Sequence, residues 1–110
     1  MENTNNQSLS AVIALGNQVI GGADALDFSA AIRKFTEQNV QHIIVDMSSV
    51  ELINSSGLGM LVSGLSIMRK IGGTLVLAVV PGKVQQILDM THLNTVLQSY
   101  STIKQAEESL

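Results

Sequence analysis

Residues 42–59 read HIIVDMSSVELINSSGLG, and the expected fold follows from these residues. His42–Met47 is a β-branched run of strand length, which predicts a buried strand. The polar pair Ser48-Ser49 and a second short apolar segment, Val50–Ile53, come next. Asn54-Ser55-Ser56 then offers short side-chain oxygens that accept hydrogen bonds from the free backbone N–H groups of a helix start. The stretch therefore predicts a strand that runs up to a functional loop, with a helix directly after it.

A helix and a second buried strand are predicted on the C-terminal side. Apolar residues recur there at the spacing of one helical face, at Leu58, Leu61, Val62, Leu65 and Met68. We expect this helix to run from about Ser56 to Lys70, and the glycines at 72 and 73 to end it. Thr74–Val80 is continuous, β-branched and bounded by glycine and proline turns. We therefore expect Thr74–Val80 at the centre of the sheet.

The rest of the chain repeats the alternation of strands and helices. Ala11–Leu15 predicts a strand followed by a loop. A helix is expected from Asp24, because one helical face carries Phe28, Ala31, Ile32 and Phe35. The C-terminal part adds a helix, a strand and a helix, at Val84–Thr91, Val96–Tyr100 and Thr102–Leu110. We expect an α/β fold in which a four- or five-stranded mixed, mainly parallel sheet packs against four helices.

Length and composition exclude several classes of protein. The chain has 110 residues, so we expect one domain at 11–110, preceded at 1–10 by a polar tail or a shortened edge strand. A net charge of −3 with six scattered basic residues offers no positive patch for nucleic acid. Cysteine is absent, which excludes disulfides, thiolate nucleophiles and cysteine zinc sites.

The sequence also carries no signal for export or for membrane insertion. The first residues, MENTNNQS, lack the basic and apolar regions of a signal peptide. The most apolar stretch, Gly73–Val80, is well short of the roughly 20 residues that cross a bilayer. We therefore expect a cytoplasmic protein without direct membrane insertion.

The serines after the strand form a plausible docking and modification site on physical grounds. A phosphate on a serine at a helix start lies near the positive end of the helix dipole and near unpaired N–H groups. Gly57 and Gly59 are small, so we expect them to leave the helix start uncovered for a partner's backbone. A helix cap without any chemistry is the alternative interpretation of Ser55 and Ser56.

At these residues the chain resembles the STAS domain, and within that family the stand-alone anti-sigma factor antagonists. The resemblance lies in the aliphatic strand Ile43–Val45 ending in Asp46, the segment Val50–Ile53, and the run Asn54-Ser55-Ser56-Gly57-Leu58-Gly59. It continues through Ile71–Leu75 and through Val84–Leu93, and covers roughly residues 11 to 100.

The resemblance implies a partner switch that is controlled at one serine. In the family, the serine directly after the acidic residue of the loop is phosphorylated by an anti-sigma factor that is itself a serine kinase. A phosphatase restores the free form. By position that serine is Ser55, with Ser56 as the second candidate. The expected partner-binding residues are Asn54, Ser55, Ser56, Gly57, Leu58, Gly59, Met60 and Ser63.

Two departures from the family pattern keep a second hypothesis open. Asn54 stands where the family usually has aspartate, which keeps the capping ability but loses the charge. Gly16-Asn17-Gln18-Val19 stands where the family has an acidic Gly-Glu-Leu-Asp stretch that helps to meet the partner. The alternative is therefore a STAS scaffold that is not phosphorylated, or a subunit of a lipid-transport or stressosome-like complex.

Enzymatic activity, metal binding and cofactor binding are not expected. A nucleophilic serine needs a base, and the only histidines, His42 and His92, accompany no Gly-x-Ser-x-Gly motif. Two histidines without cysteine partners are poor metal ligands. Gly57-Leu58-Gly59 lacks the third glycine of a dinucleotide-binding loop, so the nucleotide would belong to the kinase partner. We expect Asp46 to order the loop after its strand rather than to act as an acid.

Overall fold

β-branched and aliphatic segments form the two inner strands of the sheet. In the computed structural model, which describes residues 9–110, these strands are β3 (Val40–Asp46) and β5 (Thr74–Ala78). β1 (Leu9–Ala14) pairs with β3, and β6 (Ser99–Tyr100) pairs with β5, so the order is β1-β3-β5-β6. All of these pairings are parallel. The four-stranded α/β sheet is therefore confirmed, with β5 inside it as expected.

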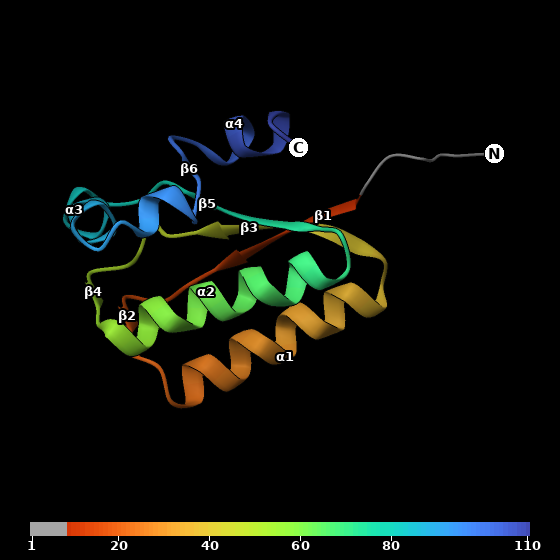
Figure 1. The fold of residues 1–110 in the computed structure, drawn as a ribbon, viewed down its shortest axis with the longest axis horizontal. Helices are drawn as coiled ribbons and strands as arrows, with labels where there is room; N and C mark the ends of the chain where they lie inside the picture. Colours follow the sequence, from red (N-terminus) through yellow and green to blue (C-terminus); the bar gives the residue numbers. More distant parts are fainter. Residues whose placement is uncertain (1–8) are drawn as a thin grey trace.

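Helices cover both faces of the sheet unequally. α1 (Ala23–Glu37) and α2 (Ser55–Lys70) lie side by side on one face and begin at the same end of the molecule (Figure 1). α3 (Gly82–Met90) and a 3-10 turn at Leu93–Thr95 connect β5 to β6. Among the helices of residues 9–110, only the six-residue α4 (Ile103–Glu108) packs on the opposite face. The expected set of four helices is present.

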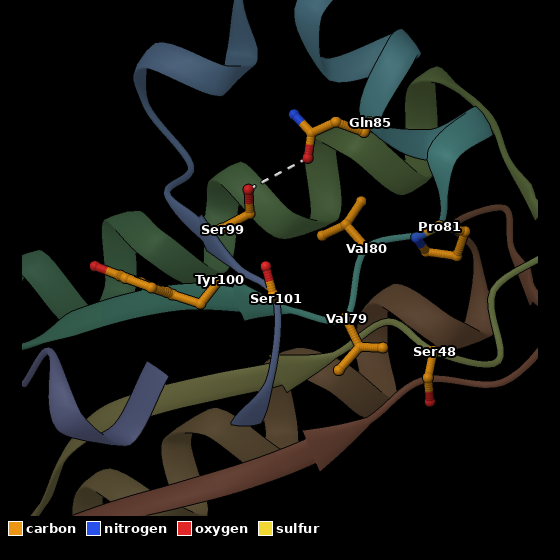
Figure 2. Close-up of a pocket in the computed structure, with 8 residues that line it drawn as sticks. All are labelled: Ser48, Val79, Val80, Pro81, Gln85, Ser99, Tyr100 and Ser101. Atoms are coloured by element: carbon orange, nitrogen blue, oxygen red, sulfur yellow. Dashed lines mark hydrogen bonds between the residues drawn. The ribbon is translucent and has the colours of Figure 1, made fainter. Parts of the chain in front are cut away.

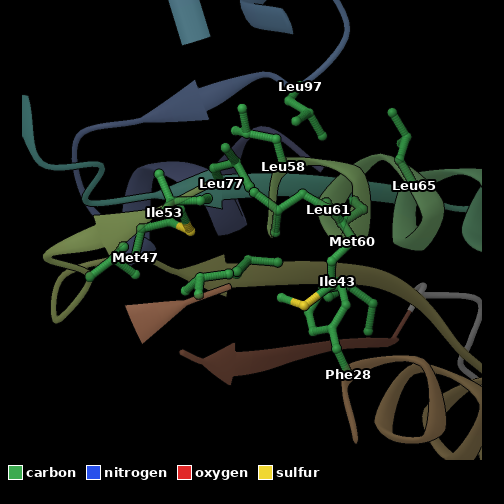
Figure 3. Close-up of a cluster of buried hydrophobic side chains, with 14 of the residues drawn as sticks. Phe28, Ile43, Met47, Ile53, Leu58, Met60, Leu61, Leu65, Leu77 and Leu97 are labelled. Atoms are coloured by element: carbon green, nitrogen blue, oxygen red, sulfur yellow. The ribbon is translucent and has the colours of Figure 1, made fainter. Parts of the chain in front are cut away.

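The larger core lies between the sheet and the pair α1–α2. Figure 3 shows side chains of this core, among them Phe28 of α1, Ile43 of β3 and Leu61 of α2. Successive strand residues point to opposite faces, so Ile44 leaves this core and packs on the other side. There it joins a smaller cluster formed with Val76, Ala78 and Ala106.

A second, small sheet lies in the segment after β1 that was expected to be a loop. β2 (Gln18–Val19) pairs in parallel with β4 (Leu52–Ile53). The Asn17 carbonyl also accepts hydrogen bonds from the N–H groups of Glu51, at 2.7 Å, and Leu52, at 3.0 Å. This pairing joins the chain before α1 to the chain before α2, so the beginnings of the two helices are held together.

Strand boundaries differ from the expected ones, and β3 covers Val40–Asp46 where His42–Met47 was expected. β1 begins at Leu9, inside the range 1–10 where a tail or shortened edge strand was expected, and residues 1–8 lie outside the described residues. β5 ends at Ala78 rather than Val80, because Val79 has φ 56° and leaves the extended conformation. The last strand is only Ser99–Tyr100.

Candidate functional site

Asn54 fixes the beginning of α2 with a side chain that bonds in two directions. Its Oδ1 accepts a hydrogen bond from the Gly57 N–H at 2.8 Å, and its Nδ2 donates to the Ile20 carbonyl at 3.4 Å. Its own N–H donates to the Val19 carbonyl at 3.3 Å. Asn54 is therefore the N-cap, as its residue type predicts, and α2 begins at Ser55, one residue earlier than expected.

Ser55 occupies the first position of α2 with an unbonded hydroxyl. Its side chain is exposed, and its Oγ has no hydrogen-bond partner within residues 9–110. The backbone N–H groups of Ser55 and Ser56 are also unpaired within this range. Unpaired N–H groups and the helix dipole favour negative charge at such a position. Another protein can therefore reach the Ser55 hydroxyl, and a phosphate there would find hydrogen-bond donors.

Ser56 is exposed too, but it lies against the loop before α1. A Cβ placed on Gly21 would come within 2.7 Å of the Ser56 Cβ. Gly21 is buried and has φ 85°, a conformation that glycine adopts readily and other residues do not. Because one side of Ser56 is occupied by this contact, the geometry favours Ser55 as the more accessible hydroxyl.

The two glycines after the serines have different roles, which corrects the expectation that both leave the helix start uncovered. A Cβ on Gly57 would collide with the Val19 carbonyl and lie 3.0 Å from Ile53 Cγ1. A Cβ on Gly59 would meet nothing within 4 Å. Gly57 is therefore required by close packing of α2 on the small sheet, and Gly59 is the one that leaves open space at the surface.

The other expected contact residues divide between core and surface. Leu58 and Met60 are buried in the larger core, with exposed fractions of 7% and 5% (Figure 3). Ser63 is exposed, and its spacing from Gly59 and Ser55 places all three on one side of α2. A partner on this side would contact Ser55, Gly59 and Ser63, whereas Leu58 and Met60 would support the surface from below.

Two exposed apolar side chains near Asn54 were missed by the sequence-based prediction. Ile20, whose carbonyl bonds to Asn54, is 45% exposed, and Leu52 of β4 is 52% exposed. Exposed apolar side chains beside one another are typical of protein contact surfaces. The sequence does carry one signal for Ile20. It is a large apolar residue directly before the Gly21-Gly22 turn, a position where the turn itself does not require such a side chain. We refer to Ile20, Leu52, Ser55, Gly59 and Ser63 as the serine surface.

Neither histidine is hydrogen-bonded to the Ser55 hydroxyl in the described part of the chain. His42 Nδ1 is hydrogen-bonded to Thr74 Oγ1 at 2.8 Å, near the opposite ends of the strands. His92 directly follows α3 and its threonine C-cap. Asp46 Oδ1 accepts a hydrogen bond from the Ser48 N–H at 3.0 Å, which confirms its expected role in ordering the loop.

The two ends of the molecule differ in charge. Asp24 and Asp27 lie in the first turns of α1, and Glu51 directly precedes β4, so all three lie at the end of the molecule that carries Ser55. The opposite end, where α1 and α2 finish, carries four cations, Arg33, Lys34, Arg69 and Lys70, and one carboxylate, Glu37. A phosphate on Ser55 would therefore add to negative charge that is already present nearby.

A separate hollow of about 440 Å³ lies at the carboxyl ends of β5 and β6 (Figure 2). It is lined by Ser48, Val79, Val80, Pro81, Gln85, Ser99, Tyr100 and Ser101. Ser99 Oγ donates to Gln85 Oε1 at 3.2 Å on its rim. Its lining includes no carboxylate, amine or imidazole, and no residue of α2, so we assign no site to it.

The described part of the chain contains neither a membrane-spanning helix nor a cluster of metal ligands. No helix within residues 9–110 has the length and apolar character needed to cross a bilayer. The same residues bring together no group of three or more histidine, aspartate or glutamate side chains that could hold a metal ion.

Comparison with known proteins identifies the family. The sequence pattern of the STAS domain matches residues 8–106. The chain belongs to the STAS domain family. A relative of this STAS domain from Thermotoga neapolitana bears a name that describes it as an anti-sigma factor antagonist homologous to TM1081. The two are 30% identical over 77 residues, which is 70% of this chain and 68% of the relative.

Solved structures share the STAS fold. The anti-sigma factor antagonist SpoIIAA in its unphosphorylated form superposes with a TM-score of 0.76 at 18% identity, covering 96% of this chain and 91% of SpoIIAA. The phosphorylated Bacillus form has a TM-score of 0.69 at 14% identity, covering 97% and 96%. A sulfate transporter family protein from Wolinella succinogenes has a TM-score of 0.77 at 17% identity, covering 88% and 80%. The STAS fold alone therefore does not decide between a regulator and a transporter part.

Proposed function

We propose that this STAS domain is an anti-sigma factor antagonist in a partner-switching pathway. Unmodified, it binds an anti-sigma factor with serine kinase activity through the serine surface, and phosphorylation of Ser55 releases the complex. The observation that carries the proposal is the exposed, unbonded hydroxyl of Ser55 at the first turn of a capped helix. The name of the Thermotoga neapolitana relative supports the same class of function.

The charge of a phosphate explains how one modification ends the contact. Phosphorylation adds about 1.5 to 2 negative charges at neutral pH. A partner that fits closely on the unmodified hydroxyl must desolvate this added charge, and that fit includes no cation placed to pair with it. About 1.4 kcal/mol is enough for a tenfold loss of affinity. The free N–H groups of Ser55 and Ser56 accommodate the phosphate without unfolding α2.

The remaining components follow from this mechanism. The kinase partner supplies the nucleotide, so the STAS domain itself needs no cofactor. A phosphatase returns Ser55 to its free form, and release of the antagonist lets the anti-sigma factor capture its sigma factor again. We place this cycle in the cytoplasm, without nucleic acid as a direct partner.

A non-phosphorylated STAS scaffold or complex subunit is the second candidate, and the bonding of Asn54 favours it. The Asn54 amide spans from α2 to the Ile20 carbonyl, which is a structural task that needs no kinase. Under this hypothesis the serine surface still docks a partner, for example in a lipid-transport or stressosome-like complex. The two candidates therefore differ in modification, not in the location of the contact.

Incubation with a candidate kinase and ATP separates the two functions. The kinase is taken from genes that neighbour this one, and intact mass and peptide mapping follow the reaction. We expect one added phosphate on Ser55, no phosphate in Ser55→Ala, and normal phosphorylation in the matched control Ser56→Ala. A kinase that binds tightly but leaves the mass unchanged would establish the scaffold instead. Phosphate on a different residue would also contradict the proposal.

A further inference from the structure

A groove of about 590 Å³ runs between the end of β1, the β2 segment and α1. Its apolar floor includes Phe28 and Met60, both buried, and Ile13, which is partly buried. Exposed amide side chains of Asn17 and Gln18 form one wall. α1 contributes the exposed residues Asp24 and Asp27 to the same lining. The lining of the groove therefore combines buried apolar residues with exposed polar ones.

The charges that line this groove are uncompensated. Asp24 and Asp27 are three residues apart on α1, so they lie on the same side of the helix. Neither carboxylate has a hydrogen bond or ion pair with any residue in 9–110. No lysine, arginine or histidine lines the groove. A cationic occupant is thus the one whose charge matches the groove.

The groove is continuous with the serine surface. Val19 lines the groove, and its carbonyl lies against Gly57 at the beginning of α2. Met60 lies in the groove floor and belongs to the second turn of α2, whose first residue is Ser55. A protein that covers Ser55 is therefore positioned to place a side chain in the groove.

We propose that this groove receives an arginine side chain from the partner protein. The aliphatic stem of arginine packs on the apolar floor, and its guanidinium donates charge-assisted hydrogen bonds to Asp24 and Asp27. A planar guanidinium reaches two carboxylates at once, which the point charge of lysine does less well. The source of the arginine rests on the proposed function, since that function supplies the partner that covers Ser55.

Titration with short peptides, followed by amide chemical shifts in two-dimensional NMR, tests the groove directly. The probe is acetyl-Leu-Arg-Leu-amide, and the control peptide has neutral citrulline in place of arginine. We expect millimolar binding of the arginine peptide, with shifts at Gly16, Asn17 and Met60, and at least about fivefold weaker binding of the citrulline peptide. Equal binding of the two peptides, no binding, or shifts confined to other regions would overturn the proposal.

Matched variants locate the effect at the two carboxylates. The double variant Asp24→Asn/Asp27→Asn should bind the arginine peptide at least about fivefold more weakly than the unmodified chain. Glu37→Gln removes an exposed carboxylate at the other end of α1 and should stay within about twofold. Circular dichroism establishes that both variants are folded. A double variant that is folded and binds as well as Glu37→Gln would overturn the proposal.

The assay distinguishes failure of the groove from failure of the proposed function, because the peptides contain no kinase and the readout does not involve Ser55. Phosphorylation of Ser55 without discrimination between the peptides would disprove the groove alone. Discrimination between the peptides without any modification of Ser55 would disprove the phosphorylation switch alone. Once the kinase is identified, Asp24→Asn/Asp27→Asn should lower the affinity of the STAS domain for this kinase by about tenfold. Ser55→Ala should still bind the kinase.

Discussion

Asn54 bonds through both ends of its amide, and the carboxylate of an aspartate could make only one of these bonds. Oδ1 caps α2 through the Gly57 N–H, and Nδ2 donates to the Ile20 carbonyl. A carboxylate would preserve the cap but would set a negative oxygen against the Ile20 carbonyl oxygen. At the scale of single residues, the departure from the usual aspartate is therefore matched by a bond that connects α2 to the loop before α1.

Replacement of Asn54 tests which of its two bonds contributes more to stability. Asn54→Ala removes both and should lower the free energy of unfolding by about 1 to 2 kcal/mol in urea denaturation. Asn54→Ser keeps a capping oxygen and loses the donor, so we expect it to recover most of that loss. If serine proves as destabilising as alanine, the bond to Ile20 rather than the cap is the important one.

A carboxylate at position 55 should affect binding and stability in opposite directions. Ser55→Asp places negative charge beside the free N–H groups at the first turn of α2. We expect its free energy of unfolding to be unchanged or raised by up to about 1 kcal/mol. Its affinity for the kinase partner, measured by calorimetry, should fall by about tenfold or more. A destabilised Ser55→Asp would show instead that the site does not tolerate an anion.

At the scale of elements, α2 is held at its beginning by a close approach to the small sheet. The Val19 carbonyl of β2 lies against the Cα of Gly57, where no side chain fits. The pairing of β2 with β4 fixes this carbonyl in position. Packing at Gly57, rather than access for a partner, therefore explains why a glycine follows the two serines.

The two glycines of α2 provide a matched pair of substitutions. Gly57→Ala forces a Cβ into the Val19 carbonyl and should cost about 2 kcal/mol or more of unfolding free energy. Gly59→Ala adds a Cβ in open space within a helix and should stabilise by about 0.5 to 1 kcal/mol. Thermal unfolding followed by circular dichroism would compare them. Equal effects of the two substitutions would contradict the assigned packing.

Elements with many periodic residues were predictable from the sequence, and short elements defined by distant contacts were not. The repeat of Leu58, Leu61 and Leu65 marks α2, and the aliphatic run from Thr74 marks β5. Strands β2 and β4 have two residues each, too few for any period, and form only because they pair with each other. For the same reason Ile20 and Leu52 escaped prediction, since their exposure depends on that pairing.

At the scale of the whole molecule, two unequal cores are separated by the sheet. The larger one joins α1, α2 and α3 to one face, and the smaller one joins α4 to the other through Ala106. Tyr100, the single tyrosine of a chain without tryptophan, packs against the smaller cluster. Its fluorescence therefore reports on the α4 face, whereas circular dichroism reports on all helices.

A charge in the smaller core should destabilise the whole domain rather than α4 alone. Ala106 is fully buried, so Ala106→Asp should cost about 2 kcal/mol or more, and Gln105→Asp, at an exposed neighbour, should cost little. We expect tyrosine fluorescence and circular dichroism to give coincident urea transitions in both variants. A fluorescence transition at lower urea than the circular dichroism transition would mean that α4 unfolds separately.

Opposite charges at the two ends of α1 and α2 give the molecule a permanent electric dipole along its helices. A phosphate on Ser55 would enlarge this dipole, because it is added at the end that is already negative. The field of such a charge extends over about 10 Å at 0.1 M ionic strength, beyond the range of direct contact. An approaching partner therefore senses the phosphate before it touches Ser55, and the change in association rate on phosphorylation should be largest in dilute salt.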